Sequence, residues 1–237
     1  KLDPPLTSMV IAIWNWIKLI LECLVLKYST LIRIGEMRNK KVLFVSEASW
    51  LPTGYSVYTN EVLSRLNKVD GIEVAEICTF ADIDDLRKNP REWKAYANKP
   101  LKTEPIYEKY SSSVSCQFGD MVFNQALLDF QPDIVMDIRD WWMMEFEQRS
   151  PFRNFFHWAI MPTVDASPQD QQWINTYASA DSVLTYSEFG RDVLKSQSDD
   201  INFIGMAPPS ASQDFFPVED KGKHKESMGI SRDCTIV

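Results

Sequence analysis

The stretch ADSVLTYSEFGRDVLKSQ (Ala180–Gln197) predicts a short strand, a tight turn and a helix in succession. Residues 181–187 contain a short apolar run with polar residues at its ends, as in a strand buried on both faces of a parallel sheet. Ser187 is placed to cap the helix that follows, and the negative charge of Glu188 stabilises its first turn. This strand-to-helix unit, with a Ser–Glu pair at its turn, sets the pattern for the fold.

The same pattern recurs along most of the chain. Strands are expected at residues 40–47, 72–80, 132–138, 154–161, 181–187 and 201–206. Helices are expected at residues 55–68, 118–130, 167–178, where Ser167 is the expected N-cap, and 188–196. Such alternation predicts an α/β fold, a Rossmann-like parallel sheet with helices on both faces. The polar residues 81–113 are expected to form an insertion with a short helix or two.

The N-terminal segment Met9–Leu26 has only three strongly polar residues, Asn15, Lys18 and Glu22. They fall within about 60° of one another on a helical wheel, which predicts an amphipathic helix in front of the sheet. Lys18 would cost about 2.5–3.5 kcal/mol in the middle of a membrane span, and no signal-peptide cleavage site follows. A helix that lies in a bilayer surface and a helix that packs on protein both stay open.

Composition excludes several classes of function. The net charge of −8, with no long Lys/Arg run, argues against a nucleic-acid partner. The four cysteines lie far apart and form no Cys/His cluster, so neither zinc nor a disulfide framework is indicated, and a reducing, cytoplasmic location is expected. The phosphate-loop and G-x-G-x-x-G patterns are absent, which argues against nucleotide triphosphatases and dinucleotide-dependent dehydrogenases.

The loops after the strands are the places to look for a site, because ligands of parallel sheets bind beyond the carboxyl ends of the strands. In the first loop, Thr53, Gly54 and Tyr55 stand at the beginning of a helix. Gly54 lets the backbone approach a ligand, and the free N–H groups of a helix start suit a diphosphate. An ordinary turn glycine gives the same pattern.

The loop after residue 138 reads Arg139, Asp140, Trp141, Trp142. A carboxylate beside an exposed aromatic face suits a sugar, whose hydroxyls bind the carboxylate while its C–H faces stack on the indole. Tryptophans packed in a core between domains would explain the residues equally well. Asp165, at the end of the next strand, either binds a hydroxyl, acts in acid/base chemistry or only orients its turn.

Several stretches together resemble, in order and spacing, the N-terminal half of GT-B glycosyltransferases of the family 4 type. They are KKVLFVSEASWLPTGYSVYTNEVLSRL (40–66), QPDIVMDIRDWW (131–142), MPTVDASP (161–168), SADSVLTYSEFGRDVLK (179–195) and residues 201–237. The most specific pieces are the strand with SEFGRDVL and the D-x-F-x-P-like element at Asp214, Phe215 and Pro217. The resemblance leaves out the N-terminal helix.

The resemblance implies retaining transfer of a sugar from a nucleotide-sugar, without cofactor or bound metal, in a cleft between two Rossmann-like domains. This chain would be the acceptor-side domain, and its acceptor a carbohydrate or a lipid-linked group. Thr53, Gly54 and Tyr55 match the loop that approaches the donor phosphates, and Asp165 occupies the catalytic position near the transferred sugar. The expected acceptor and cleft residues are Arg139, Asp140, Trp141, Trp142, Ser187 and Glu188.

Three segments are expected: an N-terminal helix at 1–36, the glycosyltransferase-like domain at 37–218, and at 219–237 a linker with the start of a truncated second domain. That second domain would carry the paired glutamates and basic residues that hold the donor, so the isolated chain is expected to be inactive. Two alternatives remain, a non-catalytic carbohydrate-binding or scaffold module and another Rossmann-like protein such as an epimerase or a periplasmic-type binder. The missing G-x-G-x-x-G loop and signal peptide count against the last.

Overall fold

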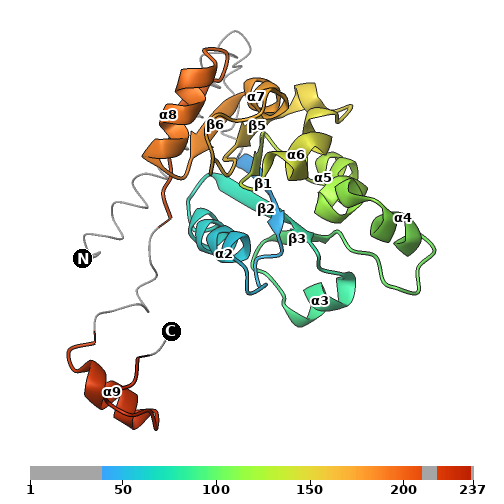
Figure 1. Cartoon of the computed structure of the whole chain (residues 1–237). Coiled ribbons are helices and arrows are strands. Elements are labelled where there is room, and N and C mark those ends of the chain that lie inside the picture. The colour runs from blue at the N-terminus through green and yellow to red at the C-terminus, as the bar shows by residue number, and fades with distance from the viewer. Residues whose placement is uncertain (1–38, 210–217, 236–237) are drawn as a thin grey trace.

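A computed structural model describes residues 39–209 and 218–235 of the chain (Figure 1). The expected N-terminal helix and the element with Asp214, Phe215 and Pro217 lie outside the described residues. The chain ends with the apolar run Cys234–Val237, whose last two residues also lie outside the described residues. Its first two residues, Cys234 and Thr235, are not in a strand. The described residues therefore contain most of the segment expected at 37–218 and one helix after it.

The described strands form one seven-stranded sheet in the order β3-β2-β1-β4-β5-β6-β7. Every neighbouring pair is parallel. The strands are β1 (Lys40–Glu47), β2 (Ile72–Thr79), β3 (Lys94–Ala97), β4 (Ile134–Asp137), β5 (His157–Ile160), β6 (Ser182–Thr185) and β7 (Phe203–Met206). The order reverses between β1 and β4, and this topological switch point is where ligands bind in open α/β sheets.

The connections between the strands are helical. They contain α2 (Gly54–Leu66), α3 (Ile83–Lys88), α4 (Tyr107–Ser112), a π-helix (Cys116–Asp120), α5 (Met121–Phe130), α6 (Trp141–Gln148), a 3₁₀ turn (Arg153–Phe155), α7 (Gln171–Ala178) and α8 (Glu188–Gln197). After the sheet comes α9 (Lys221–Ser227). It is capped by Asp220, whose carboxylate accepts from the Lys223 N–H at 2.9 Å. The helix α9 lies in the segment that the sequence assigns to a linker.

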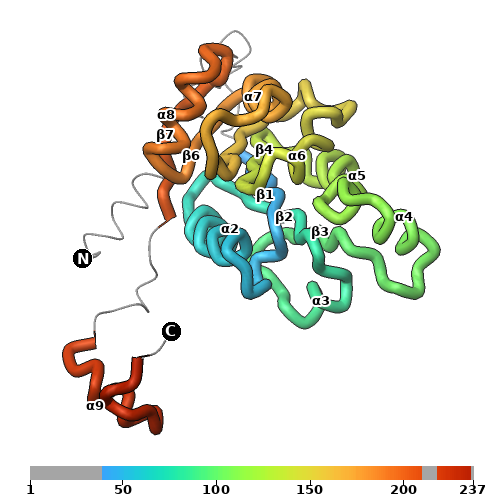
Figure 2. The backbone as a smooth tube through the Cα atoms, in the orientation of Figure 1, coloured from blue at the N-terminus to red at the C-terminus, as the bar shows by residue number. Residues whose placement is uncertain are grey.

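Two apolar layers cover the two faces of the sheet. Leu43 and Val45 of β1 face α5, α6 and α7, whereas Val42 and Phe44 face α2. This alternation is the two-residue period of a strand that is buried on both sides. Figure 2 shows α2 on one side of β1 and α5 and α6 on the other. The predicted fold class, a Rossmann-like parallel sheet with helices on both faces, is confirmed for the described residues.

The segment 81–113 differs from the insertion that the sequence predicts. It contains α3 and α4, as expected, but also β3, which joins the sheet as an edge strand parallel to β2. The strand has only four residues, KAYA, and none of them is fully buried. A strand this short and half exposed lacks the apolar run that marked the others.

Two helix starts also differ from the sequence predictions. The helix expected from Ser167 begins at Gln171 instead, because the carboxylate of Asp170 accepts from the Gln172 N–H at 2.8 Å. The side chain of Gln169 donates to the Ala166 carbonyl at 2.7 Å and keeps the preceding residues in a loop. The helix α6 was not expected, since the Trp-rich residues read as a loop, yet Trp141 is its first residue.

Candidate functional site

Three loops and one helix meet at the carboxyl edge of the sheet beside the switch point. The hydroxyl of Tyr55, in the first turn of α2, lies 2.8 Å from the Thr163 hydroxyl in the loop after β5. The hydroxyl of Tyr186, at the end of β6, donates to the Ile138 carbonyl after β4. The first hydrogen bond joins residues 108 positions apart in the chain, and the second joins residues 48 positions apart.

A pocket of about 400 Å³ lies between α2 and these loops. Its walls come from Gly54, Tyr55, Val57, Tyr58, Glu61, Thr163, Tyr186 and Pro209. The lining is mainly aromatic and aliphatic, with Glu61 as its charged residue and no Lys or Arg among the described residues that form it. A small-molecule site usually combines an apolar lining with a few polar groups, so the pocket fits that class.

The three tyrosines of the pocket are neutral, and hydrogen bonds hold their hydroxyl groups in place. Burial, together with the negative charge of Asp140, raises the pKa of the Tyr55 hydroxyl to about 12, although the hydrogen bond with Thr163 acts in the opposite direction. Burial also raises the pKa of Tyr58 and of Tyr186. The rings of Tyr58 and Tyr186 meet edge to face at 5.9 Å, and Tyr58 donates to the Ala207 carbonyl at 3.3 Å. A phenol has a single O–H, so Tyr58 and Tyr186, which donate to backbone carbonyls, can only accept from a ligand, whereas Tyr55 and Thr163 share a bond in which either can be the donor.

Thr53, Gly54 and Tyr55, which the sequence assigns to the donor phosphates, form the N-terminus of α2. Thr53 is the N-cap, and its hydroxyl oxygen accepts from the Ser56 N–H at 3.4 Å and donates to the Glu47 carboxylate. A Cβ at Gly54 would meet no atom within 4 Å. Packing inside the described structure therefore does not require glycine at this position, and the backbone there is open to solvent.

The predicted carboxylates lie along the same edge. Asp140 is half-buried after β4 and Asp165 is exposed after β5. Burial raises the pKa of Tyr177, and the negative charges of Asp140 and Asp165 both add to this effect, so the two carboxylates flank one phenol. No metal-binding group of three or more His, Cys, Asp or Glu residues occurs among residues 39–209 and 218–235.

Ser187 and Glu188 lie at the neighbouring strand end. The hydroxyl of Ser187 accepts from the Gly190 N–H at 3.2 Å, so the predicted cap is confirmed. A Cβ at Gly190 would lie 3.3 Å from the Cβ of Val164, which means that the start of α8 approaches the loop of Asp165 closely. Gly54, Asp165 and Glu188 therefore share one edge, while their roles stay predictions.

The residues predicted to bind the acceptor after β4 differ in their exposure, since Arg139 is buried and Trp142 is exposed. Arg139 is fully buried, donates to both oxygens of Asp137 and, at 2.9 Å, to the Phe118 carbonyl, and so has no surface to offer an acceptor. Trp141 stacks on Trp173 with ring centroids 5.4 Å apart. Trp142 is 43% exposed, and its ring meets that of Phe118 edge to face with centroids 5.0 Å apart. Of these aromatic residues, Trp142 keeps the larger free face.

A buried charge cluster lies directly beneath this edge. The carboxyl of Glu147 accepts from the Trp158 indole N–H and is fully buried. Burial raises the pKa of Glu147 well above its ordinary value, and the nearby carboxylate of Asp137 adds to the shift while Arg139 opposes it. Asp137, Arg139 and Glu147 therefore hold the loop after β4 from below.

Sequence reasoning did not single out Tyr58, Glu61, Thr163 or Tyr186. Tyr58 and Glu61 follow Gly54 at spacings of about one and two helical turns, and Tyr186 directly precedes Ser187. Helical spacing from Gly54 was a usable signal for the first two. Thr163 and Tyr186 reach the pocket through the parallel sheet, which no local pattern reveals.

The fold and the site define the described part as a Rossmann-like α/β domain with a pocket at its switch point. None of its helices is long and apolar enough to cross a membrane. No protein-family model matches the chain, and no curated protein matches it. Among solved structures it is similar to a sucrose-phosphate synthase from Thermosynechococcus elongatus, with 12% identity and a TM-score of 0.47, over 73% of this chain and 90% of that one.

Two further solved structures show a comparable likeness. A UDP-N-acetylglucosamine 2-epimerase shares 14% identity with a TM-score of 0.45, over 70% of this chain and 45% of that one. The N-terminal domain of Candida albicans trehalose-6-phosphate phosphatase shares 13% with a TM-score of 0.48, over 83% of this chain and 55% of that one. The chain thus spans about half the length of these two proteins, and with TM-scores below 0.5 the likenesses carry no argument about function.

Proposed function

We propose that the chain is the acceptor-side domain of a retaining, metal-independent glycosyltransferase of the GT-B, family 4 type. The observation that carries the proposal is the convergence of the α2 start, Asp140 and Thr163 around a pocket at the switch point. The sequence resemblance supports it as well, because Gly54, Asp165 and Glu188, which it assigns to the site, lie along this same edge. The donor would be a nucleotide-sugar and the acceptor a carbohydrate or a lipid-linked group, in the cytoplasm.

The chemistry of the pocket suits a polyhydroxylated ligand. The rings of Tyr55, Tyr58 and Tyr186 would pack against the C–H groups of a sugar, and the phenol oxygens and the Glu61 carboxylate would accept hydrogen bonds from its hydroxyls. The edge is otherwise acidic, with Asp140 and Asp165 beside the pocket. A diphosphate would therefore take its neutralising charge from the second domain and meet this chain at the N–H groups of Thr53, Gly54 and Tyr55.

In the proposed reaction an acceptor oxygen forms a bond to the anomeric carbon on the face that the diphosphate leaves. The bond between that carbon and the diphosphate oxygen breaks, the diphosphate keeps the electron pair, and it receives the proton of the acceptor hydroxyl. Asp165 would bind a hydroxyl of the transferred sugar, and Ser187, Glu188 and Trp142 would line the acceptor side. Arg139 would act from beneath, by fixing the loop of Asp140.

The alternative is a carbohydrate-binding or scaffold module without transfer activity. The observation that favours it is the lack of Lys and Arg in the described pocket lining, since a neutral sugar needs no cationic partner. Both functions predict sugar binding at the pocket. They differ in whether a nucleotide-sugar binds and reacts once a second domain is present.

The test is thermal unfolding in the presence of UDP-, GDP- and ADP-sugars and of free sugars, on this chain and on the full reading frame. A ligand at a hundred times its Kd stabilises the folded state by about 2.7 kcal/mol, which is readily measured. We expect free sugars to stabilise both proteins and one nucleotide-sugar to stabilise, and be consumed by, the longer one. Sugar binding without nucleotide-sugar binding in either protein would favour the module, and no stabilisation at all would refute both.

A further inference from the structure

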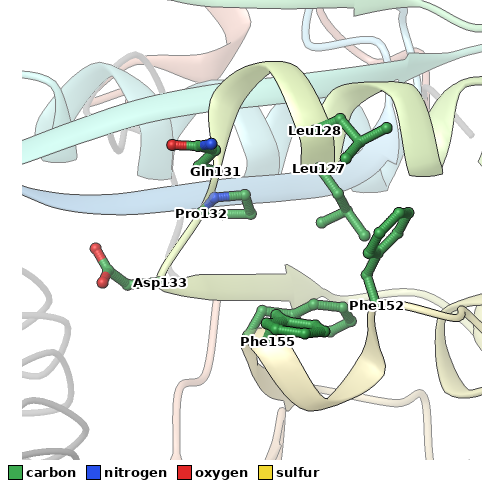
Figure 3. Close-up of a pocket in the computed structure, with 8 residues that line it drawn as sticks. Leu127, Leu128, Gln131, Pro132, Asp133, Phe152 and Phe155 are labelled. Carbon is green, nitrogen blue, oxygen red and sulfur yellow. The ribbon is translucent and has the colours of Figure 1, made fainter.

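An apolar groove of about 400 Å³ lies at the opposite, amino-terminal end of the sheet (Figure 3). Leu127 and Leu128 at the end of α5 face Phe152 and Phe155, which lie before β5. Leu128 is 63% exposed and Phe155 80% exposed. Large apolar side chains gathered in an open groove usually mark a surface that binds another apolar element.

The chain enters the sheet at the rim of this groove. Asp133 lines the groove, and its carboxylate accepts from the backbone N–H of Lys41 at 2.9 Å. The ammonium group of Lys40, the first residue of β1, lies 3.7 Å from the same carboxylate. The polypeptide that precedes residue 39 therefore starts beside the groove.

That preceding polypeptide contains the apolar segment Met9–Leu26. On a helical wheel, Ile13, Ile20 and Leu24 lie opposite the polar stripe of this segment, so they form the centre of its apolar face. Residues 27–38 can span up to about 40 Å when extended, which is ample for a groove that begins at the rim of β1. The reach of residues 27–38, the point where β1 begins and the apolar character of residues 9–26 thus all allow this segment to occupy the groove.

We propose that residues 9–26 form a helix that docks its apolar face into the groove of Leu127, Leu128, Phe152 and Phe155 of the same chain. The stripe of Asn15, Lys18 and Glu22 then faces water. The groove lies at the end of the sheet opposite the pocket and shares no lining residue with it. The inference therefore holds whether or not the protein transfers sugars. Of the two arrangements left open by the sequence, the helix packed on protein is the one that the groove supports.

The test is limited trypsin cleavage of the full chain after Lys18, followed by mass spectrometry. A docked helix resists cleavage, because a protease binds its substrate as an extended strand. We expect Leu128→Asp and Phe155→Asp to accelerate this cleavage about tenfold, which corresponds to about 1.4 kcal/mol of docking free energy. The matched control is Val114→Asp, at an apolar residue of similar exposure, 60%, outside the groove, and its rate should equal that of the wild type.

A double-mutant cycle makes the contact specific. Ile20→Asp alone should accelerate the cleavage as much as Leu128→Asp, and the double variant no more than either, because the two substitutions remove one interaction. Circular dichroism establishes that the exposed substitutions leave the sheet folded.

Three results would overturn the proposal. One is cleavage after Lys18 at equal rates in the wild type, the groove variants and the Val114→Asp control. Another is protection that increases with protein concentration, which would assign the groove to a second copy. The third is protection that requires vesicles of phosphatidylcholine and phosphatidylglycerol and is equal in the wild type and Phe155→Asp, which would place the segment in a bilayer surface.

Discussion

The segment from the end of β4 to the first turn of α6 contains two layers of residues with opposite exposure. Asp137 and Arg139 are fully buried and bonded to each other, whereas Asp140 is half-buried and Trp142 is exposed. The buried layer contacts only protein, and the exposed layer reaches the edge where a ligand would lie. Two charged residues that are adjacent in sequence can thus have separate roles. Arg139 holds the loop in place, and Asp140 lies where it could contact a ligand.

The largest effect should come from breaking the buried layer. Arg139→Met leaves the Asp137 carboxylate buried without its partner, so we expect the free energy of unfolding in urea to fall by about 3–5 kcal/mol. The control is Arg191→Met, which removes the exposed ion pair with Asp192 and should change stability little. Equal effects of the two substitutions would mean that the buried pair does not support the fold.

A second prediction concerns Glu147, whose pKa burial raises above the ordinary value of 4.5. The folded state then binds the proton more tightly than the unfolded state, so the stability that Glu147 contributes is fully present below about pH 4.5 and is lost as pH rises through the raised pKa. Over that range Glu147→Gln should remove a slope of up to about 1.4 kcal/mol per pH unit, while its amide oxygen still accepts from Trp158.

The measurement is urea unfolding of the wild type and Glu147→Gln at several values between pH 4.5 and 8. Burial also raises the pKa of Glu76, so a part of the slope should persist in the variant. Parallel stability profiles for the two proteins would show that Glu147 ionises equally in the folded and unfolded states.

The exposed layer should affect binding rather than folding. Asp140→Asn removes a negative charge beside Tyr55, and we expect the affinity for a sugar ligand, measured by calorimetry, to fall about tenfold, or about 1.4 kcal/mol. The unfolding midpoint should stay unchanged. A matched control is Glu145→Gln, on α6 and outside the pocket. If Asp140→Asn lowers stability without affecting affinity, Asp140 belongs with the buried layer.

The smallest effect should come from the helix start at the rim. Ser187→Ala removes the acceptor for the Gly190 N–H and should destabilise the domain by about 1 kcal/mol, whereas Ser187→Gly should cost only a few tenths. Thermal unfolding of both variants, with and without a sugar, gives the comparison. A loss of sugar affinity larger than the loss of stability would show that Ser187 also contacts the ligand.

Much of the fold was readable because local periodicity reports burial. The runs at β1, β4 and β6 are apolar on both faces, and Ser187 carries its cap within three residues of sequence. Local signals failed where several choices were chemically equivalent. Ser167 and Asp170 are both good caps, and the backbone of Gln169 is held outside the helix by two hydrogen bonds with the side chain of Gln197, which is distant in sequence.

The site was predicted less completely than the fold. Gly54, Asp165 and Glu188 could be assigned to one edge, since strand ends of a parallel sheet share it. The side-chain direction of Arg139 could not, because an arginine in a loop reads the same whether it bonds to Asp137 or to a ligand. The pocket itself depends on Tyr55 meeting Thr163, a contact between distant residues that no local pattern encodes.

The brevity of β3 has a consequence for solubility. Each edge of the sheet ends in a strand of only four residues, β3 on one side and β7 on the other. A short edge offers few unpaired backbone groups to a foreign strand, and the charge of Lys94 at the start of β3 further opposes such pairing. The shortness of β3, which prevented its prediction from the sequence, thus protects the domain from edge-to-edge aggregation.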